Sequence, residues 1–136
     1  MSSSTLEDLG KLILRLAIGV LILFHGWAKL MHGIGSIEGM MAARGLPAFF
    51  AWGVYIGEVV APLLLIVGLY ARLGALLVAA NMVVAFLLVH TTHVFQLSGS
   101  GGWRLELQAM YFFGAVAVAM LGAGRFSLGG RGGRWN

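Results

Sequence analysis

The sequence predicts an all-α fold, an integral membrane four-helix bundle, and two observations carry that prediction. Of the 136 residues, 60% are hydrophobic and 10% are charged, whereas soluble domains average about 25% charged residues. The hydrophobic residues are concentrated in four stretches of about the length that a membrane-crossing helix needs, at about residues 10–30, 49–70, 73–91 and 105–122. We expect residues 1–136 to form a single membrane domain.

Composition also excludes several functions. The chain contains no cysteine, so it has no disulfide, no thiolate metal site and no iron–sulfur cluster of its own. Its net charge of +4 is too small and too scattered for a nucleic-acid-binding surface, and basic ends beside anionic lipid explain it better. Any redox chemistry therefore depends on a bound cofactor, a quinone or a partner subunit.

The first span carries its own charges. It contains Arg15, His25 and Lys29, and a charge near the middle of a membrane helix costs about 2.5–3.5 kcal/mol. Arg15 and Lys29 share one helical face with two glycines, which allow another backbone to approach closely. We expect Arg15 and His25 each to pair with groups on other helices inside the protein, whereas Lys29 either pairs there or extends to the interface. No small-residue cleavage site follows, so we expect the span to be kept rather than removed as a signal peptide.

The connector after the first span predicts an interfacial segment at about residues 34–45. Ser36 can cap a short helix there, and Gly45 and Pro47 can end it. Such a helix would lie along the membrane surface over the mouth of the bundle. An irregular loop is the alternative.

The second span holds a carboxylate near mid-membrane. Pro62 follows Glu58 by one turn, so the Glu58 carbonyl loses its helical partner and a kink is expected. A ridge of small residues for helix packing is formed by Gly53, Gly57 and Ala61. An ionisable group inside the membrane indicates a functional site. A purely structural ion pair between Glu58 and Arg15 or Lys29 is the alternative.

The third and fourth spans add further polar side chains. Asn81 lies near the centre of the third span, where bonding between helices is its commonest role. His90 and His93 lie at the far end of that span, and Glu106 and Gln108 open the fourth. These two groups therefore come to the same membrane level.

Lysine and arginine predict the orientation. One side carries Lys11, Arg72, Arg125, Arg131 and Arg134, and the other carries Lys29, Arg44 and Arg104. The positive-inside rule then places both termini on the cytoplasmic side, with the basic, glycine-rich tail at 123–136 touching lipid headgroups. On the other side, residues 96–104 are rich in glycine and serine, which predicts a flexible exposed loop.

This topology brings polar residues of four spans together in the outer half of the bundle, with Arg15 about 15 Å deeper than His25 at 1.5 Å per residue. A quinone suits such a site, because its ring needs an apolar slot and its carbonyls need groups that deliver protons on reduction. The predicted catalytic residues are His25 and Lys29 as donors and Glu58 as proton relay. The predicted ligand-binding residues are Arg15, Lys29, Glu58, Asn81, His90, Glu106 and Gln108, of which Glu106 releases the proton or orients His90.

Histidine allows one other cofactor. His25 and His90 lie on non-adjacent spans at compatible depth, so they could be the axial ligands of a b-type haem. No pair of the polar residues has the HxxxH or ExxH spacing of a helical metal site. No metal ion is therefore expected.

The chain resembles the DoxX family of small four-helix membrane proteins from about Leu9 to Leu128. The matching residues are Arg15, Gly19, Gly26, Lys29, Gly45-Leu-Pro47, Glu58, Gly68, Arg72, Gly74, Met82 to Ala85, Glu106 and the closing GAGRFSLGG. The family usually closes with GxGxxSLD, and Gly129 stands here in place of the aspartate. The resemblance implies a bundle in the cytoplasmic membrane and an association with quinone-linked oxidoreduction, because some relatives are similar to small subunits of thiosulfate:quinone oxidoreductase.

These observations favour a small multi-pass protein of the cell inner membrane that acts in quinone-linked electron transfer or redox-stress defence. We expect it to work with a second copy of itself or with a partner oxidoreductase subunit. One alternative is a scaffold or assembly factor, in which the buried charges only set the helix register. Another is a small-molecule carrier that uses the same polar pocket.

Overall fold

A computed structural model describes residues 1–136 and is all-helical, with no β-strand. Its elements are α1 (Ser3–His32), α2 (Gly35–Ala43), α3 (Gly53–Tyr55), α4 (Ala61–Val67), α5 (Ala71–Ala85) and α6 (Glu106–Leu121). Helices α3 and α4 belong to one continuous segment, Ala48–Val67, and α5 continues as far as His93. Three segments, α1, Ala48–Val67 and Ala71–His93, are long and apolar enough to cross a membrane. The chain is therefore a multi-pass membrane protein.

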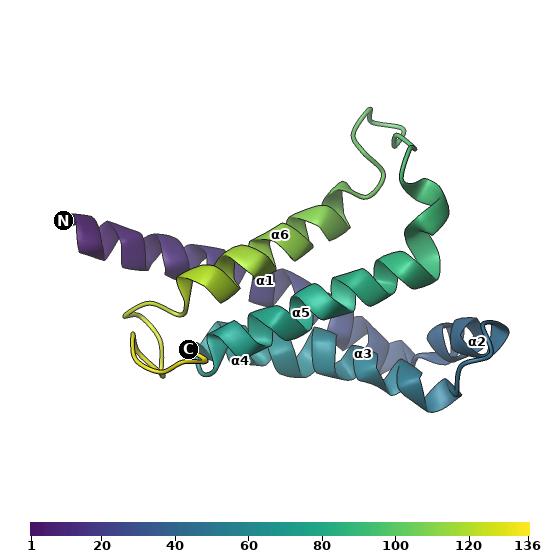
Figure 1. Ribbon diagram of the computed structural model, residues 1–136, viewed down its shortest axis with the longest axis horizontal. Coiled ribbons are helices and arrows are strands. Elements are labelled where there is room, and N and C mark those ends of the chain that lie inside the picture. The colour runs from purple at the N-terminus through teal and green to yellow at the C-terminus, as the bar shows by residue number, and fades with distance from the viewer.

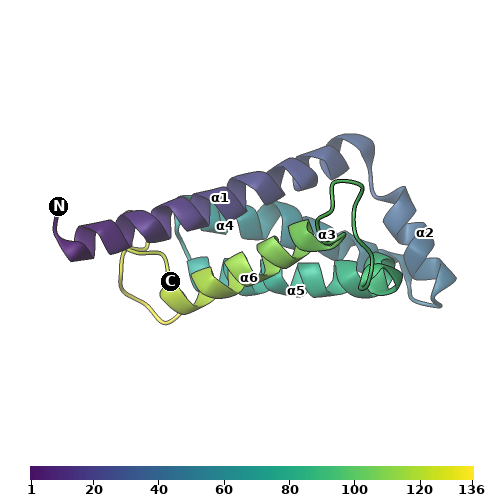
Figure 2. The same cartoon turned by 90° about the horizontal axis from the view of Figure 1, so that it is seen from above.

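The long helical segments pack in a closed order. Helix α1 contacts α4 and α6, and α5 contacts the same two helices, as Figures 1 and 2 show from two directions. Both chain termini lie at one end of the molecule, whereas α2 and the loop between α5 and α6 lie at the other. We call these the terminal end and the α2 end.

The centre of the molecule is an apolar core to which each helix contributes small or branched side chains. Ile22 of α1, Leu65 of α4, Val78 of α5 and Val118 of α6 are all at most 1% exposed. Large apolar side chains also cover the outside, such as Phe24, which is 67% exposed. An apolar exterior of this kind fits contact with lipid.

Glycines bring the helix backbones close together at two crossings. A β-carbon at Gly19 would lie 3.1 Å from the Pro62 carbonyl oxygen, and one at Gly57 would lie 2.5 Å from the β-carbon of Asn81. Gly53 has open space where its side chain would be. The predicted small-residue ridge therefore packs only through Gly57 and Ala61, of which Ala61 is fully buried.

The terminal end is closed by the C-terminal segment, residues 122–136, which folds back onto the bundle. The Leu128 N–H donates to Val67 O at 3.1 Å and the Arg72 N–H to Trp135 O at 3.0 Å. Arg131 pairs with the buried Asp8 of α1, and this bond raises the pKa of the Arg131 guanidinium. The segment predicted to touch lipid headgroups is thus hydrogen-bonded to three helices.

The loop between α5 and α6 is more regular than its glycine and serine content predicted. The Trp103 indole N–H donates to Val94 O at 2.7 Å, and the Arg104 N–H donates to Gln96 O at 3.0 Å. Ser98 N–H donates across the loop to Gly102 O at 2.7 Å. The loop is therefore a small hydrogen-bonded hairpin rather than an unstructured connection.

Candidate functional site

A charged pair crosses between helices in the half of the bundle nearest α2. The Lys29 ammonium of α1 donates to Glu58 Oε2, with Nζ and Oε2 2.5 Å apart. Asn81 of α5 donates from Nδ2 to the other carboxylate oxygen, Oε1, at 3.2 Å. The Glu58 carboxylate is almost fully buried, whereas 26% of the Lys29 side chain is exposed. Both oxygens of a buried charge are thus satisfied, as its burial requires.

Local backbone geometry explains where Glu58 points. Residues Ile56–Val60 form a π-helical turn, and Pro62 lacks the N–H that would bond to the Glu58 carbonyl. That carbonyl lies instead against Gly26 of α1, where any side chain would overlap it. The sequence predicted a kink here, and the structure has a π turn, a form that often occurs at functional sites.

The charged pair lies at the wall of a cavity of about 400 Å³, which we call the Lys29–Glu58 cavity. Its polar lining residues are Lys29, Glu58 and Asn81, and most of the others are apolar. Ligand pockets commonly measure about 300–1,000 Å³ and combine apolar walls with a few polar groups. The cavity therefore has the size and lining of a small-molecule site.

Helix α2 covers one side of this cavity, where it contributes Met40 and Met41. It begins at Gly35 with no side-chain cap, so Ser36 lies in its first turn rather than at its cap. Just after α2, Arg44 donates from Nη1 to Leu87 O at 2.8 Å and from Nη2 to Leu88 O at 2.9 Å. Sequence analysis did not single out Arg44 for this role, because its acceptors are backbone carbonyls of a distant π turn, Phe86–His90.

A second, smaller cavity lies on the other side of the charged pair. It measures about 180 Å³, and we call it the central chamber; its polar and aromatic lining residues are His25, Lys29, Glu58, His90, Gln108 and Tyr111. His25 packs edge-on against Tyr111 with ring centres 6.0 Å apart. Because Lys29 and Glu58 line both cavities, the ion pair forms the wall between them.

Both ring nitrogens of His90 face other side chains. Nε2 lies 3.3 Å from Nε2 of Gln108, and Nδ1 lies 3.2 Å from Nδ1 of His93. His90 is thereby linked to α6 and to the end of its own helical segment. No three histidine, aspartate or glutamate side chains are grouped as a metal ion would require.

The structure gathers six of the predicted site residues around these two cavities: His25, Lys29, Glu58, Asn81, His90 and Gln108. Arg15 lies elsewhere, at the terminal end. Its guanidinium donates to Ala123 O at 3.0 Å and to Phe126 O at 2.8 Å, and the residue is 1% exposed. The ion pair between Arg15 and Glu58 that the sequence left open is therefore not formed, because backbone carbonyls of the C-terminal segment accept from both Nη groups of Arg15.

Glu106 also lies outside both cavities. It is the first residue of α6, it is exposed, and its carboxylate lies beside Gly102 of the preceding loop. The depth argument gave Glu106 a level in the bundle but not a direction. Helix α6 is apolar on nearly all sides, so its sequence pattern does not indicate which side chains face the centre.

Comparison with known proteins finds a matching family and two similar sequences. The DoxX family model matches residues 10–91 of the chain. A Haemophilus influenzae protein described as "Uncharacterized protein" is 30% identical over 118 residues, which cover 85% of this chain and 84% of that protein. A Bacillus subtilis protein named "Putative oxidoreductase CatD" is 29% identical over 104 residues, 76% of this chain and 77% of that protein. No solved structure matches the chain at a significant level.

Proposed function

The chain belongs to the DoxX family, and from that premise we propose that it is a small membrane subunit of a quinone-linked oxidoreductase or redox-stress system. The observation that carries this proposal is the Lys29–Glu58 ion pair, which forms the wall between an apolar cavity and a chamber lined by histidines. The name of the Bacillus subtilis relative points in the same direction. The quinone ring would bind in the Lys29–Glu58 cavity.

The donor groups at this wall suit a ligand with carbonyl oxygens. An ammonium group has three N–H donors, and Glu58 accepts only one from Lys29. Asn81 likewise gives one of its two amide N–H groups to Glu58. Donors therefore remain for a ligand that brings acceptors, and the apolar walls suit a ring and its hydrocarbon chain.

The same pair is placed to hold a proton. Nζ of Lys29 and Oε2 of Glu58 are 2.5 Å apart, so the pair places a proton-bearing group directly beside an acceptor at the cavity wall. On the chamber side, His25, His90 and Gln108 supply further groups that exchange protons or form hydrogen bonds. A bound quinone would be reduced with electrons from the partner oxidoreductase subunit, and this chain would supply the protons.

The haem alternative has less support. His25 and His90 do line the same chamber, but it measures only about 180 Å³ and both His90 nitrogens have side-chain partners. A haem ligand needs a ring nitrogen free to bind iron. We therefore propose a quinone rather than haem as the ligand.

We further propose that α6 is a fourth span, with both termini in the cytoplasm and the protein in the cell inner membrane. Helix α6 has 16 residues, which span about 24 Å at 1.5 Å per residue. Both termini lie at the same end of the molecule, as an even number of crossings requires. The partner would be a second copy of the chain or an oxidoreductase subunit.

Quinone binding by the purified protein in lipid nanodiscs tests the proposal. Lys29→Met and Glu58→Gln should each raise the Kd for decylubiquinone at least tenfold. The double variant Lys29→Met/Glu58→Gln leaves no unpaired buried charge and checks that the loss is not unfolding. Glu38→Gln on α2 is the matched control, because Glu38 lines no cavity described here and has no hydrogen-bond partner through its side chain. Equal affinity in all variants would reject the proposal and favour the scaffold.

A second candidate function, a small-molecule carrier, is favoured by one observation. The Lys29–Glu58 pair lines cavities on both of its sides, as a polar gate between two compartments would. Flux of a small solute into proteoliposomes that stops in the Glu58→Gln variant would support the carrier. Absence of flux for the wild-type protein would leave the quinone-linked function as the stronger proposal.

A further inference from the structure

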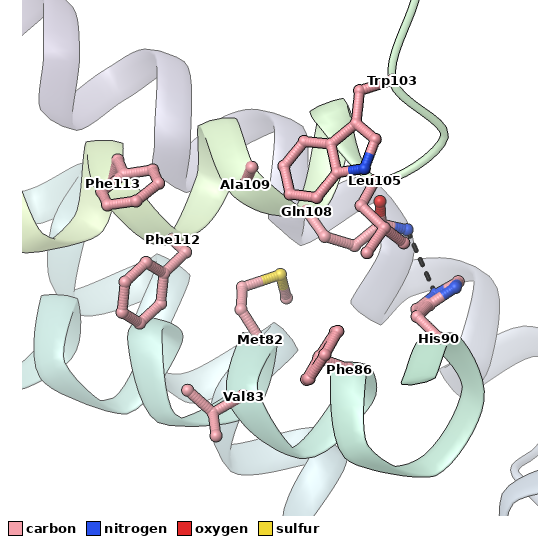
Figure 3. Close-up of a pocket in the computed structure, with 10 residues that line it drawn as sticks. All are labelled: Met82, Val83, Phe86, His90, Trp103, Leu105, Gln108, Ala109, Phe112 and Phe113. Carbon is pink, nitrogen blue, oxygen red and sulfur yellow. Dashed lines mark hydrogen bonds between the residues drawn. The ribbon is translucent and has the colours of Figure 1, made fainter. Parts of the chain in front are cut away.

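The hollow between α5 and α6 adds no separate site at the α2 end. Figure 3 shows that it is lined mainly by apolar side chains, with His90 and Gln108 joined by a hydrogen bond. Met82, His90 and Gln108 also line the central chamber, so this hollow belongs to the site already described. The charged groups which that site does not use lie at the terminal end of the molecule.

A buried carboxylate organises the basic groups of the terminal end. Asp8 of α1 is 1% exposed; its Oδ2 accepts from Nη2 of Arg131, and its Oδ1 accepts from the Arg125 N–H at 3.1 Å. Gly124 packs against the same part of α1, because a β-carbon there would lie 3.2 Å from Asp8 Oδ1 and 3.3 Å from Cβ of Lys11. Asp8 therefore holds the C-terminal segment so that Arg125 directly follows the contact with Lys11.

Two of the cations around Asp8 have no anionic partner. Asp8–Arg131 is one of only two ion pairs in the chain, and the other lies in the ligand site. Neither the Lys11 ammonium nor the exposed Arg125 guanidinium is therefore paired with a carboxylate. Asp8 and its exposed neighbour Glu7 carry two negative charges against these three cations, so an excess of positive charge remains.

Lys11 and Arg125 lie at the level of the lipid headgroups. Lys11 directly precedes the apolar stretch of α1, and Arg125 lies at the same level because Gly124 packs against Lys11. The Arg125 guanidinium lies over the Phe126 ring, 4.8 Å from its centre, and Leu128 is 79% exposed. Basic and aromatic side chains are typical of the boundary between membrane and water. An anion bound between Lys11 and Arg125 would thus lie where a lipid carries its phosphate.

We propose that Lys11 and Arg125 together bind the phosphate of an anionic phospholipid, in a site positioned by Asp8. Ammonium and guanidinium groups form strong, charge-assisted hydrogen bonds with phosphate. The excess positive charge favours a lipid of net negative charge, such as phosphatidylglycerol, over phosphatidylcholine, whose choline cation it repels. Whereas the sequence predicted a basic tail beside lipid headgroups, this site takes one of its two cations from α1 and depends on the fold. It shares no residue with either cavity, so its loss should leave quinone affinity unchanged.

Native mass spectrometry of the full chain in detergent measures this binding, with phosphatidylglycerol and phosphatidylcholine of identical acyl chains as probes. The first phosphatidylglycerol should bind at least tenfold more tightly than the first phosphatidylcholine. Millimolar inorganic phosphate should not displace it, because free phosphate lacks the acyl chains that contact the apolar surface of the helices. Equal affinity for the two lipids, or displacement by inorganic phosphate, would overturn the proposal.

Matched substitutions locate the phosphate. Lys11→Gln and Arg125→Gln should each weaken phosphatidylglycerol binding about fivefold, the usual effect of one basic residue beside anionic lipid. Arg134→Gln removes an equal charge from the same segment and should change binding less than twofold, because Arg134 has no hydrogen bond or ion pair with Asp8. The double variant Lys11→Gln/Arg125→Gln should lose less than the product of the single effects, since both side chains contact one phosphate. An equal loss in Arg134→Gln, or independent losses in the double variant, would refute a shared site.

Asp8 provides the sharpest test, because a defined site and general attraction by surface charge predict opposite results. Asp8→Asn makes the chain more positive, so general attraction would strengthen phosphatidylglycerol binding. If Asp8 positions the C-terminal segment, the same variant should instead weaken binding at least threefold. Stronger binding by Asp8→Asn would reject the site. The unfolding temperature of each variant is measured alongside, and should Asp8→Asn fail to fold, the comparison of Arg125→Gln with Arg134→Gln decides.

Discussion

The Glu58 carbonyl oxygen lies against the α-carbon of Gly26, and no side chain fits between them. Pro62 leaves this carbonyl without its usual helical donor, and the absence of a side chain on Gly26 lets α1 approach it. This backbone contact sets the distance between α1 and the π turn. That distance in turn allows Lys29, one turn along α1, to reach the Glu58 carboxylate.

We therefore expect Gly26→Ala to weaken both the fold and the ion pair. The added methyl would lie 2.9 Å from Cγ2 of Val59 besides overlapping the Glu58 carbonyl, and overpacking of this kind typically costs about 1–3 kcal/mol. Thermal unfolding in detergent, together with quinone affinity, measures both effects. Gly10→Ala is the control on the same helix, since nothing lies within 4 Å of a methyl group there. Equal stability of the two variants would contradict the role of the contact.

Sequence reasoning identified the components of the charged pair but left its partners open. Lys29, Glu58 and Asn81 were recognisable because polar residues are rare in membrane helices, and Pro62 indicated a distortion beside Glu58. The sequence offered Arg15 and Lys29 equally as partners of Glu58. The packing of the helices decides between them, since Arg15 lies 14 residues before Lys29 in α1 and bonds to the C-terminal segment instead.

We expect Arg15 to support the fold at the terminal end, because it bonds there and lines neither cavity. Arg15→Met removes charged hydrogen bonds to Ala123 O and Phe126 O, which are worth about 1.5–3 kcal/mol each. We expect a clearly lower unfolding temperature with unchanged quinone affinity. Lys11→Met on the same helix, which removes a cation without a hydrogen-bonded partner, should change neither. Loss of affinity at unchanged stability would instead restore Arg15 to the ligand site, as the sequence predicted.

Asn136 occupies the space beside Gly129, the position where the family usually has aspartate. Its Oδ1 accepts from the Ala71 N–H at the start of α5 at 3.2 Å, and α5 has no cap from its own preceding side chain. A β-carbon at position 129 would collide with the Asn136 amide. Asn136 thus caps α5 from a distant part of the chain.

This arrangement predicts compensation between the two positions. Asn136→Ala should lower the free energy of unfolding by about 1 kcal/mol, as loss of a helix cap usually does. Gly129→Asp should destabilise the wild-type protein by collision but restore stability in the Asn136→Ala background. Unfolding temperatures of the two single variants and the double variant measure this coupling. Additive losses in the double variant would mean that an aspartate at position 129 does not replace Asn136 as the cap of α5.

Arg44 should control access to the Lys29–Glu58 cavity. Arg44→Gln removes two charge-assisted hydrogen bonds that hold the end of α2 to Leu87 and Leu88. We expect severalfold faster dissociation of bound quinone, measured by stopped-flow fluorescence, with a small change in unfolding temperature because Arg44 is exposed. Arg104→Gln, a cation at the same end but in the hairpin loop, is the control. An unchanged dissociation rate would mean that α2 does not cover the entrance.

The parts of the structure that sequence could not foresee share one physical cause. Arg15, Arg44 and Arg72 all donate to backbone carbonyls, which every residue possesses, so no pattern in the sequence identifies the acceptor. The C-terminal segment illustrates the consequence. Its glycines and arginines predicted a free basic tail, whereas its backbone hydrogen bonds to Val67 and Arg72 hold it against the bundle.

The number of membrane crossings can be tested directly, because the chain has no cysteine of its own. Single variants Ser3→Cys, Ser100→Cys and Gly132→Cys place a thiol near the N-terminus, in the hairpin loop and in the C-terminal segment, all at exposed positions. With four crossings and cytoplasmic termini, a membrane-impermeant maleimide should label only the Ser100→Cys variant in intact cells, and all three after lysis. Helix α6 is the shortest of the four candidate spans, and a helix of about 24 Å would cross with local thinning of the bilayer. Labelling of Gly132→Cys together with Ser100→Cys in intact cells would mean that α6 does not cross, and that the chain has three spans.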